Sequence, residues 1–400
     1  MLIATCWPNK DVTVLLSLNA LAGESASRFI FKYPTHDLNF TTLRYPVSDR
    51  LKSKISSSMV AKRLLLRRIV LCSTVTVVLL LIAGAYWLYT PSSPYIPLSG
   101  LDPASVSMIA VGDQGSGDLQ QWRVGRAMER VASNDGRLDM VVFLGDNFYG
   151  KPLASTHDFN WQTKFERVYW GHWLSHVPFY AVLGNHDYPV SQKYEIEYGQ
   201  QHKGSGRWQM PTNFYIKDFG EVDGRPLVRM VFLDTSAPRE SLQQQIDLID
   251  QAFQMPGPAP VWRIAASHHP VRNQGQHGEE SDLVARLLPA LQRNKIDLLL
   301  SGHDHNQQLL LRAGEPAWVI SGAGGQKLYA LNSPTPDSAF TASRAGFAKL
   351  DLNACRLRLA YYNDRGDLEA GYRWDRDCQW MAKGCLIPEE SHGTTAQLAP

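Results

Sequence analysis

The sequence predicts an α/β domain whose central sheet or sheets are covered by helices, preceded by one apolar segment long enough to cross a membrane. From about residue 106 onward, short unbroken apolar runs alternate with stretches of helical periodicity, which is typical of α/β proteins. Five of these runs are followed at once by side chains that bind metals. The content of 44% hydrophobic and 20% charged residues excludes a disordered, collagen-like or coiled-coil chain.

The apolar segment runs from Ile69 to Tyr89 and holds 21 residues without a charge, enough for a helix across the hydrocarbon core. Four basic residues lie at 62–68, whereas the first charge after the segment is Asp102. The positive-inside rule then places the rest of the chain on the periplasmic, luminal or extracellular side. We interpret the segment as an uncleaved signal-anchor in the lipid bilayer. A signal peptide cleaved after Ala85 is the alternative, and it would make the protein secreted.

Charge is distributed unevenly along the chain, with 11 Lys and Arg against 4 Asp and Glu in residues 1–68. The remaining residues carry 29 basic against 34 acidic side chains. This mildly acidic body does not favour a nucleic-acid partner, and the sequence leaves the oligomeric state open. The expected organisation is an unassigned extension at 1–58 (a disordered tail or an upstream over-translation), a basic flank and membrane anchor at 59–90, a Pro/Ser linker at 91–103, the α/β domain at 104–385 and a flexible tail at 386–400.

Within the domain, hydrophobic periodicity predicts both strands and helices. The apolar runs predict strands at 107–112, 140–145, 179–184, 228–234, 262–267, 297–302, 317–321, 346–351 and 356–362. Amphipathic stretches predict helices near 119–133, 158–174, 240–254 and 281–293. Near the end of the domain, Cys378 and Cys385 bracket a short loop, and export would permit a disulfide between them.

Five strand ends carry the chemistry of the chain. Ligands of open α/β sheets gather at the carboxyl ends of strands, so these five segments are expected to meet at one rim. The segments are GDQG (112–115), GDNFY (145–149), GNHD (184–187), SHHPV (267–271) and GHDHN (302–306).

The donor types in these segments predict two metal ions. Seven oxygen and imidazole donors are too many for one tetrahedral site, and two metals that share Asp146 accommodate them. A set with three anionic donors suits a trivalent ion, and a mostly neutral set suits a divalent ion such as Fe, Zn or Mn. The first set is Asp113, Asp146, Tyr149 and His305, and the second is Asp146, Asn185, His268 and His303.

With these five segments the chain resembles the calcineurin-like metallophosphoesterases and, within them, the purple acid phosphatases. Tyr149 in GDNFY carries the closer resemblance, because other members of the superfamily lack this tyrosine. The first segment has Gln114 and Gly115 after Asp113, without the histidine that is usual there. The likeness is greatest to the small tartrate-resistant acid phosphatases and extends from Met108 to Tyr362. It implies a β-sandwich core flanked by α-helices, of the metallophosphoesterase type.

The resemblance also implies an activity. The expected enzyme is a binuclear acid phosphatase that hydrolyses phosphate monoesters, with anhydrides as a further substrate class, by attack of a metal-bound hydroxide. Tyr149 would bind Fe(III) in the first set, and the divalent ion would occupy the second. His186 and His277 are implied to bind phosphate or to protonate the leaving alkoxide. Two alternatives stay open: a phosphodiesterase with two divalent ions, and a catalytically silent, membrane-tethered binding module.

Several residues differ from the small enzymes or have a supporting role. Gln114 replaces a tryptophan and His269 replaces a tyrosine, and both changes bear on substrate preference. We interpret His269 as structural or surface, and Asp187 and Asn306 as hydrogen-bond partners of the ligands. Few residues follow Thr235 before the next helix, so the regulatory loop of the mammalian enzymes is expected to be absent.

Overall fold

In a computed structural model, the chain forms two compact units, Met1–Leu81 and Ile82–Pro400. The structure describes residues 2–5, 11–16, 29–34, 49–90, 92–254, 256–376 and 386–389. The predicted disulfide between Cys378 and Cys385 lies outside these residues.

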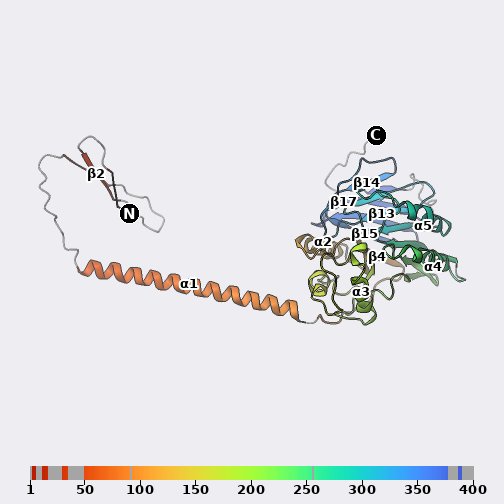
Figure 1. The fold of residues 1–400 in the computed structure, drawn as a ribbon, viewed down its shortest axis with the longest axis horizontal. Helices are drawn as coiled ribbons and strands as arrows, with labels where there is room; N and C mark the ends of the chain where they lie inside the picture. The colour runs from red at the N-terminus through yellow and green to blue at the C-terminus, as the bar shows by residue number, and fades with distance from the viewer. Residues whose placement is uncertain are drawn as a thin grey trace. The chain divides into compact units, whose positions relative to one another are not determined.

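The first unit contains a three-stranded antiparallel sheet and most of the long helix α1 (Asp49–Tyr89). The stretch Lys62–Trp87 of α1 is long and apolar enough to span a membrane, and none of it is buried. The helix begins upstream of the predicted basic flank (Figure 1). The strands of the small sheet are β1 (Leu2–Thr5), β2 (Asp11–Leu16) and β3 (Phe29–Pro34).

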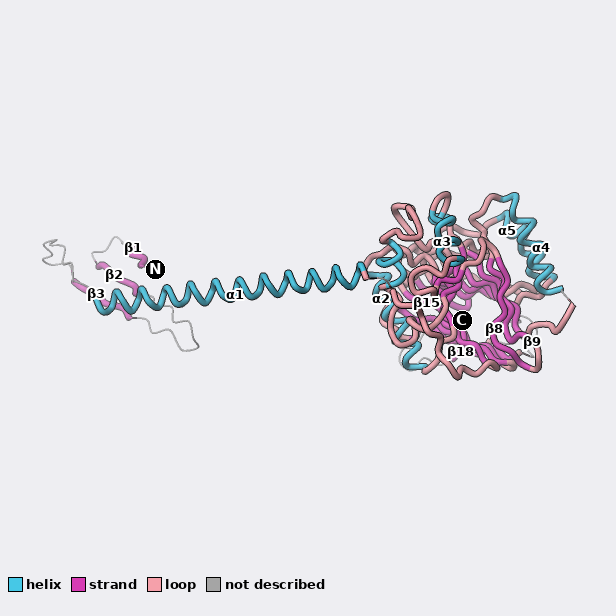
Figure 2. The backbone as a smooth tube through the Cα atoms, turned by 90° about the horizontal axis from the view of Figure 1, so that it is seen from below, coloured by secondary structure: helices cyan, strands magenta, loops and turns pink. Residues whose placement is uncertain are grey.

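Two mixed sheets form the centre of the second unit (Figures 1 and 2). The first has the order β18-β17-β16-β15-β4-β5-β6-β7, and the second has the order β14-β12-β13-β11-β10-β9-β8. The strands of the first sheet are β4 (Ser105–Val111), β5 (Met140–Leu144), β6 (Phe179–Val182), β7 (Trp208–Gln209), β15 (Gly346–Asn353), β16 (Arg356–Asn363), β17 (Leu368–Asp375) and β18 (Ile387–Glu389). Those of the second are β8 (Tyr215–Val222), β9 (Arg225–Phe232), β10 (Trp262–Ser267), β11 (Leu298–Ser301), β12 (Gln307–Leu310), β13 (Ala317–Ser321) and β14 (Ser338–Ala342).

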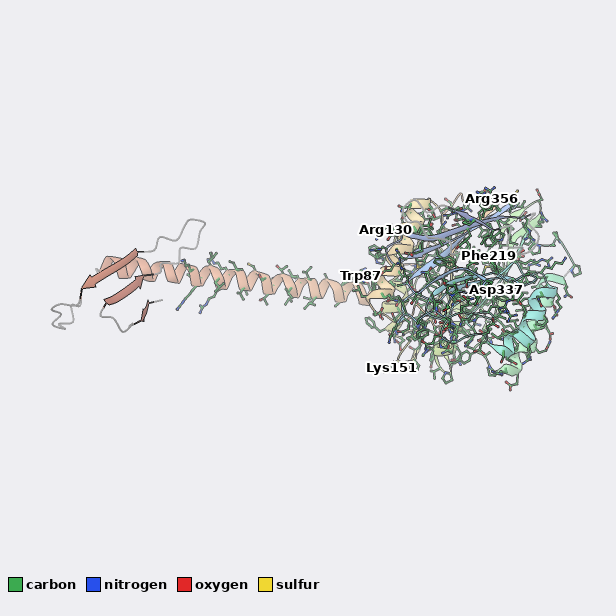
Figure 3. All side chains as sticks on the ribbon, turned by 90° about the horizontal axis from the view of Figure 1, so that it is seen from above. Trp87, Arg130, Lys151, Phe219, Asp337 and Arg356 are labelled. Carbon is green, nitrogen blue, oxygen red and sulfur yellow. The ribbon has the colours of Figure 1, made fainter. Side chains whose placement is uncertain are left out.

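The main hydrophobic core lies between these two sheets. Alternate side chains of both sheets meet there, including Met108 and Val142 from the first sheet and Met230 and Leu300 from the second. Phe219 belongs to the same core (Figure 3). Burial of two facing apolar surfaces is what makes a two-sheet sandwich stable.

Helices cover the outer faces of the sandwich (Figure 2). The apolar face of α2 (Leu119–Asp135) packs over the first sheet, and α4 (Leu242–Gln254) and α5 (Ser281–Arg293) pack over the second. The short α3 (Ser191–Gln200) precedes β7. The mixed α/β fold predicted from the sequence is confirmed, including the predicted strands.

The helix predicted at 158–174 is wrong. Within that segment only residues 160–166 are helical, most of them in the π-helix Gln162–Glu166, and turns make up the rest. The Arg207 guanidinium donates to the carbonyls of Tyr169 and Leu174, and Gln121 donates to the carbonyl of Lys164. Because side chains satisfy these carbonyls, the backbone does not need a regular helix there.

Several strands were not expected from the sequence, among them β8, β12, β14 and β17. The strand β18 begins the segment that was assigned to a flexible tail. It pairs with β17, and Glu389 accepts a hydrogen bond from Arg358 Nε at 2.7 Å. Pairing with a partner strand, rather than local composition, decides such three-residue elements.

Candidate metal centre

The five predicted segments meet at one rim of the sandwich. Strands β4, β5 and β6 are parallel neighbours in the first sheet, and β10 and β11 are parallel neighbours in the second. Their carboxyl ends therefore point to the same side. All seven predicted ligands lie within this rim, in two groups that share its centre.

The first group is anionic and buried. The Tyr149 hydroxyl lies 3.0 Å from Asp113 Oδ1 and 3.0 Å from His305 Nε2. His305 Nε2 lies 3.4 Å from the same carboxylate oxygen. Asp113, Tyr149 and His305 are all buried, so their polar atoms face one another rather than water.

The second group is neutral and more open to solvent. Asn185 Oδ1 lies 3.0 Å from His268 Nε2 and 3.1 Å from His303 Nδ1. The two imidazole nitrogens are 3.2 Å apart. Asn185 is exposed and His303 is half-buried, whereas His268 is fully buried.

Asp146 lies between the two groups. Its Oδ1 atom is 3.4 Å from His268 Nε2. One ligand atom from each of Asp113, Asp146 and His268 lies within 4.8 Å of the other two, a grouping that could hold a metal ion. Asp146 is therefore positioned to contribute to both groups.

The backbone is strained where it presents these ligands. Asp113, Asp146 and His303 have φ values of 58°, 53° and 68°, in the left-handed region that non-glycine residues rarely adopt. A side chain at Gly184 would collide with the backbone and carboxylate of Asp146, and one at Gly302 would collide with Asp113 Oδ2. Strain of this kind is typical of functional sites, and the close approaches explain the glycines before Asn185 and His303.

The histidine rings are oriented by main-chain carbonyls. His268 Nδ1 lies 2.9 Å from the Leu144 carbonyl, and His305 Nδ1 lies 2.7 Å from the Lys327 carbonyl. A carbonyl only accepts, so in each neutral ring Nδ1 carries the proton and the lone pair of Nε2 faces the cluster. Metal-binding histidines are oriented in this way. Donor atoms that lie about 3 Å from one another, with their lone pairs directed to a common point, can each bind the same cation at about 2.0–2.2 Å.

The charges of the cluster favour the same conclusion. Burial raises the pKa of Asp113, and burial with repulsion from Asp113 and Asp146 raises that of Tyr149. Burial opposes a charge on His268, but Asp146 and Asp113 outweigh it and raise the pKa of this ring. The buried anions thus require a positive charge nearby, and a bound cation would supply it.

His186 and His277 lie beside different ligands, Tyr149 and His303. The His186 ring is 4.5 Å from the Tyr149 ring, and its backbone N–H donates to Asp146 Oδ1 at 2.8 Å. The His277 ring is 4.2 Å from the His303 ring. Both imidazoles are exposed at the rim, where a substrate would arrive.

Carboxylates outside the ligand set hold the loops in place. Asp187 is buried and accepts from the backbone N–H groups of Phe148 and Gly184, which fixes the turn that carries Asp146. Asp304 accepts from the backbone of Gln276 and His277, and its Oδ2 lies 3.5 Å from His277 Nδ1. The supporting role predicted for Asp187 agrees with these contacts.

Asn306 and Asp304 are likewise joined, since Asn306 Nδ2 donates to Asp304 Oδ1 at 3.0 Å. Asp304 itself was not singled out in the sequence. Its position between His303 and His305 in GHDHN was a signal that could have identified it.

His269, interpreted from the sequence as structural or surface, lies beside the ligand groups. Ring nitrogens of His268, His269 and His303 lie within 4.8 Å of one another, because His269 extends the carboxyl end of β10 toward the rim. Burial lowers the pKa of His269 to about 3. Tyr329 was also missed; its ring stacks on His305 at 4.0 Å, and it comes from a distant loop that no local pattern connects to the site.

Comparison with known proteins supports the family resemblance that the sequence motifs indicated. A profile of the calcineurin-like phosphoesterase family matches residues 109–307. Purple acid phosphatase 4 of Arabidopsis thaliana is 29% identical over 288 residues, which cover 68% of this chain and 83% of that protein. Tartrate-resistant acid phosphatase type 5 of Sus scrofa is 30% identical, with 64% of this chain and 83% of that protein covered.

A solved structure described as GAP50, the anchor in the inner membrane complex of Plasmodium, has a similar fold. Its TM-score is 0.61 at 21% identity, and the match covers 67% of this chain and 88% of that one. At this identity the likeness concerns the fold alone. On its sequence relatives, the chain is a hydrolase of the calcineurin-like phosphoesterase family, with the purple and tartrate-resistant acid phosphatases as homologues.

Proposed function

We propose that this protein is a binuclear acid phosphatase that hydrolyses phosphate monoesters. The observation that carries the proposal is the convergence of an anionic and a neutral donor group on either side of Asp146. Two cations held there would polarise a phosphoryl oxygen and supply a nucleophilic water at neutral or acidic pH. The charge difference between the groups supports Fe(III) in the first and a divalent ion in the second.

The chain's own side chains would bind and orient the phosphate. Asn185 is exposed beside the neutral group, and its amide can donate to a phosphoryl oxygen. His186 and His277 lie at the rim, within reach of a phosphate that rests on the ligands. A protonated imidazole at either position would neutralise the ester dianion and give its proton to the departing alkoxide. Asp304 Oδ2 would keep the His277 ring oriented for that transfer.

A visible absorption spectrum of the purified full-length protein, loaded with iron, tests the metal assignment. A phenolate bound to Fe(III) gives a charge-transfer band, and we expect the Tyr149→Phe variant to lose it. A colourless but active protein would instead favour two divalent ions, with Tyr149 in a structural role.

Matched esters test the reaction. We expect p-nitrophenyl phosphate to be hydrolysed and bis(p-nitrophenyl) phosphate to react far more slowly, with both activities abolished in Asp113→Asn. A preference for the diester would support the phosphodiesterase alternative. The intact ligand groups argue against a catalytically silent module, although the structural neighbour is described as an anchor. A metal-loaded protein without activity would support the silent module.

We also propose that α1 anchors the enzyme in a membrane, with the catalytic unit on the extracytoplasmic side. The exposed apolar stretch Lys62–Trp87 supports this proposal, as does the basic flank on its N-terminal side only. We expect resistance to alkaline carbonate extraction, and we expect the catalytic unit to be protected from protease that is added to the cytoplasmic side of intact membranes. Release by carbonate, or digestion of the catalytic unit from the cytoplasmic side, would contradict the proposal.

A further inference from the structure

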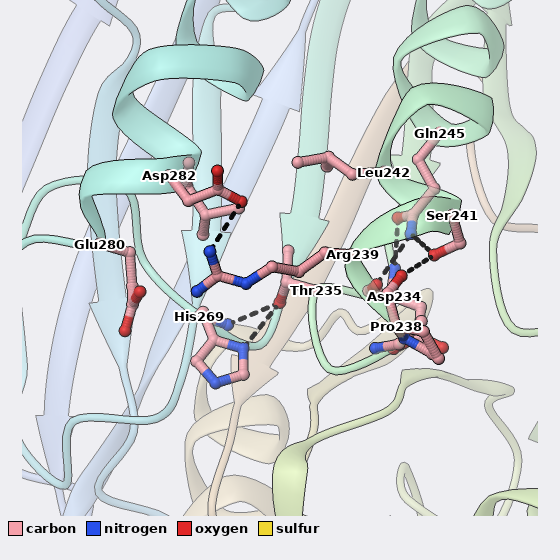
Figure 4. A pocket seen from close by; sticks show the side chains of 12 residues that line it. Asp234, Thr235, Pro238, Arg239, Ser241, Leu242, Gln245, His269, Glu280 and Asp282 are labelled. Atoms are coloured by element: carbon pink, nitrogen blue, oxygen red, sulfur yellow. Dashed lines mark hydrogen bonds and ion pairs between the residues drawn. The ribbon is translucent and has the colours of Figure 1, made fainter.

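A cavity of about 210 Å³ lies beside His269, outside the metal-ligand groups. The loop after β9, the start of α4 and the start of α5 enclose it (Figure 4). Its walls combine apolar residues, such as Leu242 and Leu283, with the polar side chains of Thr235, Arg239 and Glu280. This volume is below the roughly 300–1,000 Å³ of most ligand pockets, so the cavity suits a small group.

The cavity shares a wall with the candidate metal centre. His269 lines it, and the same ring lies 4.3 Å from the His303 ring and 5.0 Å from the His268 ring. An ester whose phosphate rests on the ligand groups can therefore extend its alcohol portion past His269 into this space.

Thr235 fixes the orientation of the His269 ring through two contacts (Figure 4). The backbone N–H of His269 donates to Thr235 Oγ1 at 2.9 Å, and the same oxygen lies 3.0 Å from His269 Nδ1. When the Thr235 hydroxyl donates to Nδ1, the ring carries its proton on Nε2. In that tautomer His269 offers a hydrogen-bond donor to a substrate.

Among the charged residues that line the cavity, one carboxylate has no hydrogen-bond or ion-pair partner in the described part of the chain. Arg239 approaches Asp282 at 3.6 Å, and the buried Asp234 accepts from Tyr188 and Asn213. The Glu280 side chain, in contrast, makes no hydrogen bond or ion pair with any residue in the described part of the chain. It can accept from a hydroxyl or an ammonium group of a ligand.

We propose that this cavity is the subsite for the leaving alcohol and that it selects small alcohols with hydrogen-bond donors, such as an amino alcohol or a polyol. The inference rests on the proposed phosphatase function. Glu280 accepts from the donors of the alcohol, and the Nε2–H of His269 holds the phosphate or its ester oxygen. Among the described residues that line the cavity, His269 supplies the sole aromatic ring, so an aryl group finds no stacking partner beyond it.

Pairs of esters that differ only in donors test the selectivity of the full-length, metal-loaded enzyme. The pairs are phosphoethanolamine with ethyl phosphate, and glycerol 1-phosphate with propyl phosphate. We expect kcat/KM to favour the donor-bearing member of at least one pair by about tenfold, the value of one hydrogen bond to a charged group. A preference within the first pair would identify an amine as the recognised donor, and a preference within the second pair would identify a hydroxyl.

The variant Glu280→Gln should reduce that preference to about twofold or less and leave the alkyl esters almost unchanged. The matched control is Glu240→Gln, which removes an exposed charge from the neighbouring loop without lining the cavity. We expect it to keep the preference of the natural enzyme. No preference in either pair, or an equal effect of Glu280→Gln on both members, would overturn the subsite.

A second pair of variants tests the orientation of His269. Thr235→Val removes the hydroxyl that fixes the ring, and we expect kcat/KM for ethyl phosphate to fall about tenfold. Thr235→Ser keeps the hydroxyl and should restore the natural rate. An unchanged kcat/KM in Thr235→Val, or an equal loss of kcat/KM in Thr235→Ser and Thr235→Val, would contradict the role of Thr235.

The outcomes also separate this inference from the function on which it rests. Hydrolysis of p-nitrophenyl phosphate without selectivity within the alkyl pairs would contradict the proposed subsite but not the proposed phosphatase function. No hydrolysis of any ester by the metal-loaded protein would contradict both proposals.

Discussion

The two halves of the candidate metal centre differ in charge and in exposure. The half formed by Asp113, Tyr149 and His305 is anionic and buried beneath the rim. The half formed by Asn185, His268 and His303 is neutral and reaches solvent through Asn185 and His303. A buried anionic set binds a highly charged ion and keeps it, whereas an open neutral set binds a divalent ion more weakly and can exchange it. The difference suggests that one half retains its ion while the other meets the substrate.

Asp146→Asn should have the largest effect on activity, because both halves of the centre depend on this carboxylate. We expect kcat to fall by about three orders of magnitude or more, as the electrostatic support of the reaction is lost. Elemental analysis should show less than the two metals per chain proposed for the natural protein. Full metal content with normal activity would show that Asp146 is not shared.

We expect that the ion proposed for the neutral half can be removed selectively. Asn185→Ala, or brief dialysis against a mild chelator, should remove one ion and lower kcat about 100-fold. The absorption band of the other ion should persist, and a divalent salt should restore the chelated enzyme. Simultaneous loss of both ions would indicate that the halves do not differ in affinity.

A smaller effect is expected from Tyr149→Phe in the anionic half. In the proposed centre the phenolate would add charge to an ion that Asp113 and Asp146 also bind, so we expect a fall in kcat of about tenfold or less. The visible band should disappear completely. Unchanged colour in this variant would falsify the assignment of the phenolate.

An effect of similar size is expected beside the neutral half, at Asp304. Asp304→Asn keeps the shape but weakens the orientation of His277 and its backbone, and we expect kcat to fall about tenfold. Metal content should remain that of the natural protein. A comparable loss of bound metal would show that Asp304 supports the ligands rather than His277.

Much of the site was predictable because its signals are local. A short apolar strand followed by a metal-type ligand is visible in the sequence five times, and in four of these segments a glycine stands before the ligand. The glycines matter because the ligands at Asp113 and Asp146 adopt positive φ and approach other backbones closely. The family resemblance added His186 and His277, both of which lie at the rim.

The residues that were missed depend on contacts between distant segments. Tyr329 stacks on His305 from a loop with no recognisable pattern. The segment 158–174 has helical spacing, but Arg207 and Gln121 supply hydrogen bonds to its carbonyls from elsewhere in the chain. Periodicity reports which residues are apolar and cannot report where backbone groups find their partners.

The sequence by itself determined the α/β class, the apolar helix and the identity of the seven candidate ligands, because strand patterns and ligand types are properties of short segments. Only the tertiary structure decided how those ligands divide in space and that His269 faces them. It also brought Glu280 and Thr235 together around one cavity. Such neighbours come from different loops, and their distances are set by the packing of two sheets and their helices rather than by any local preference.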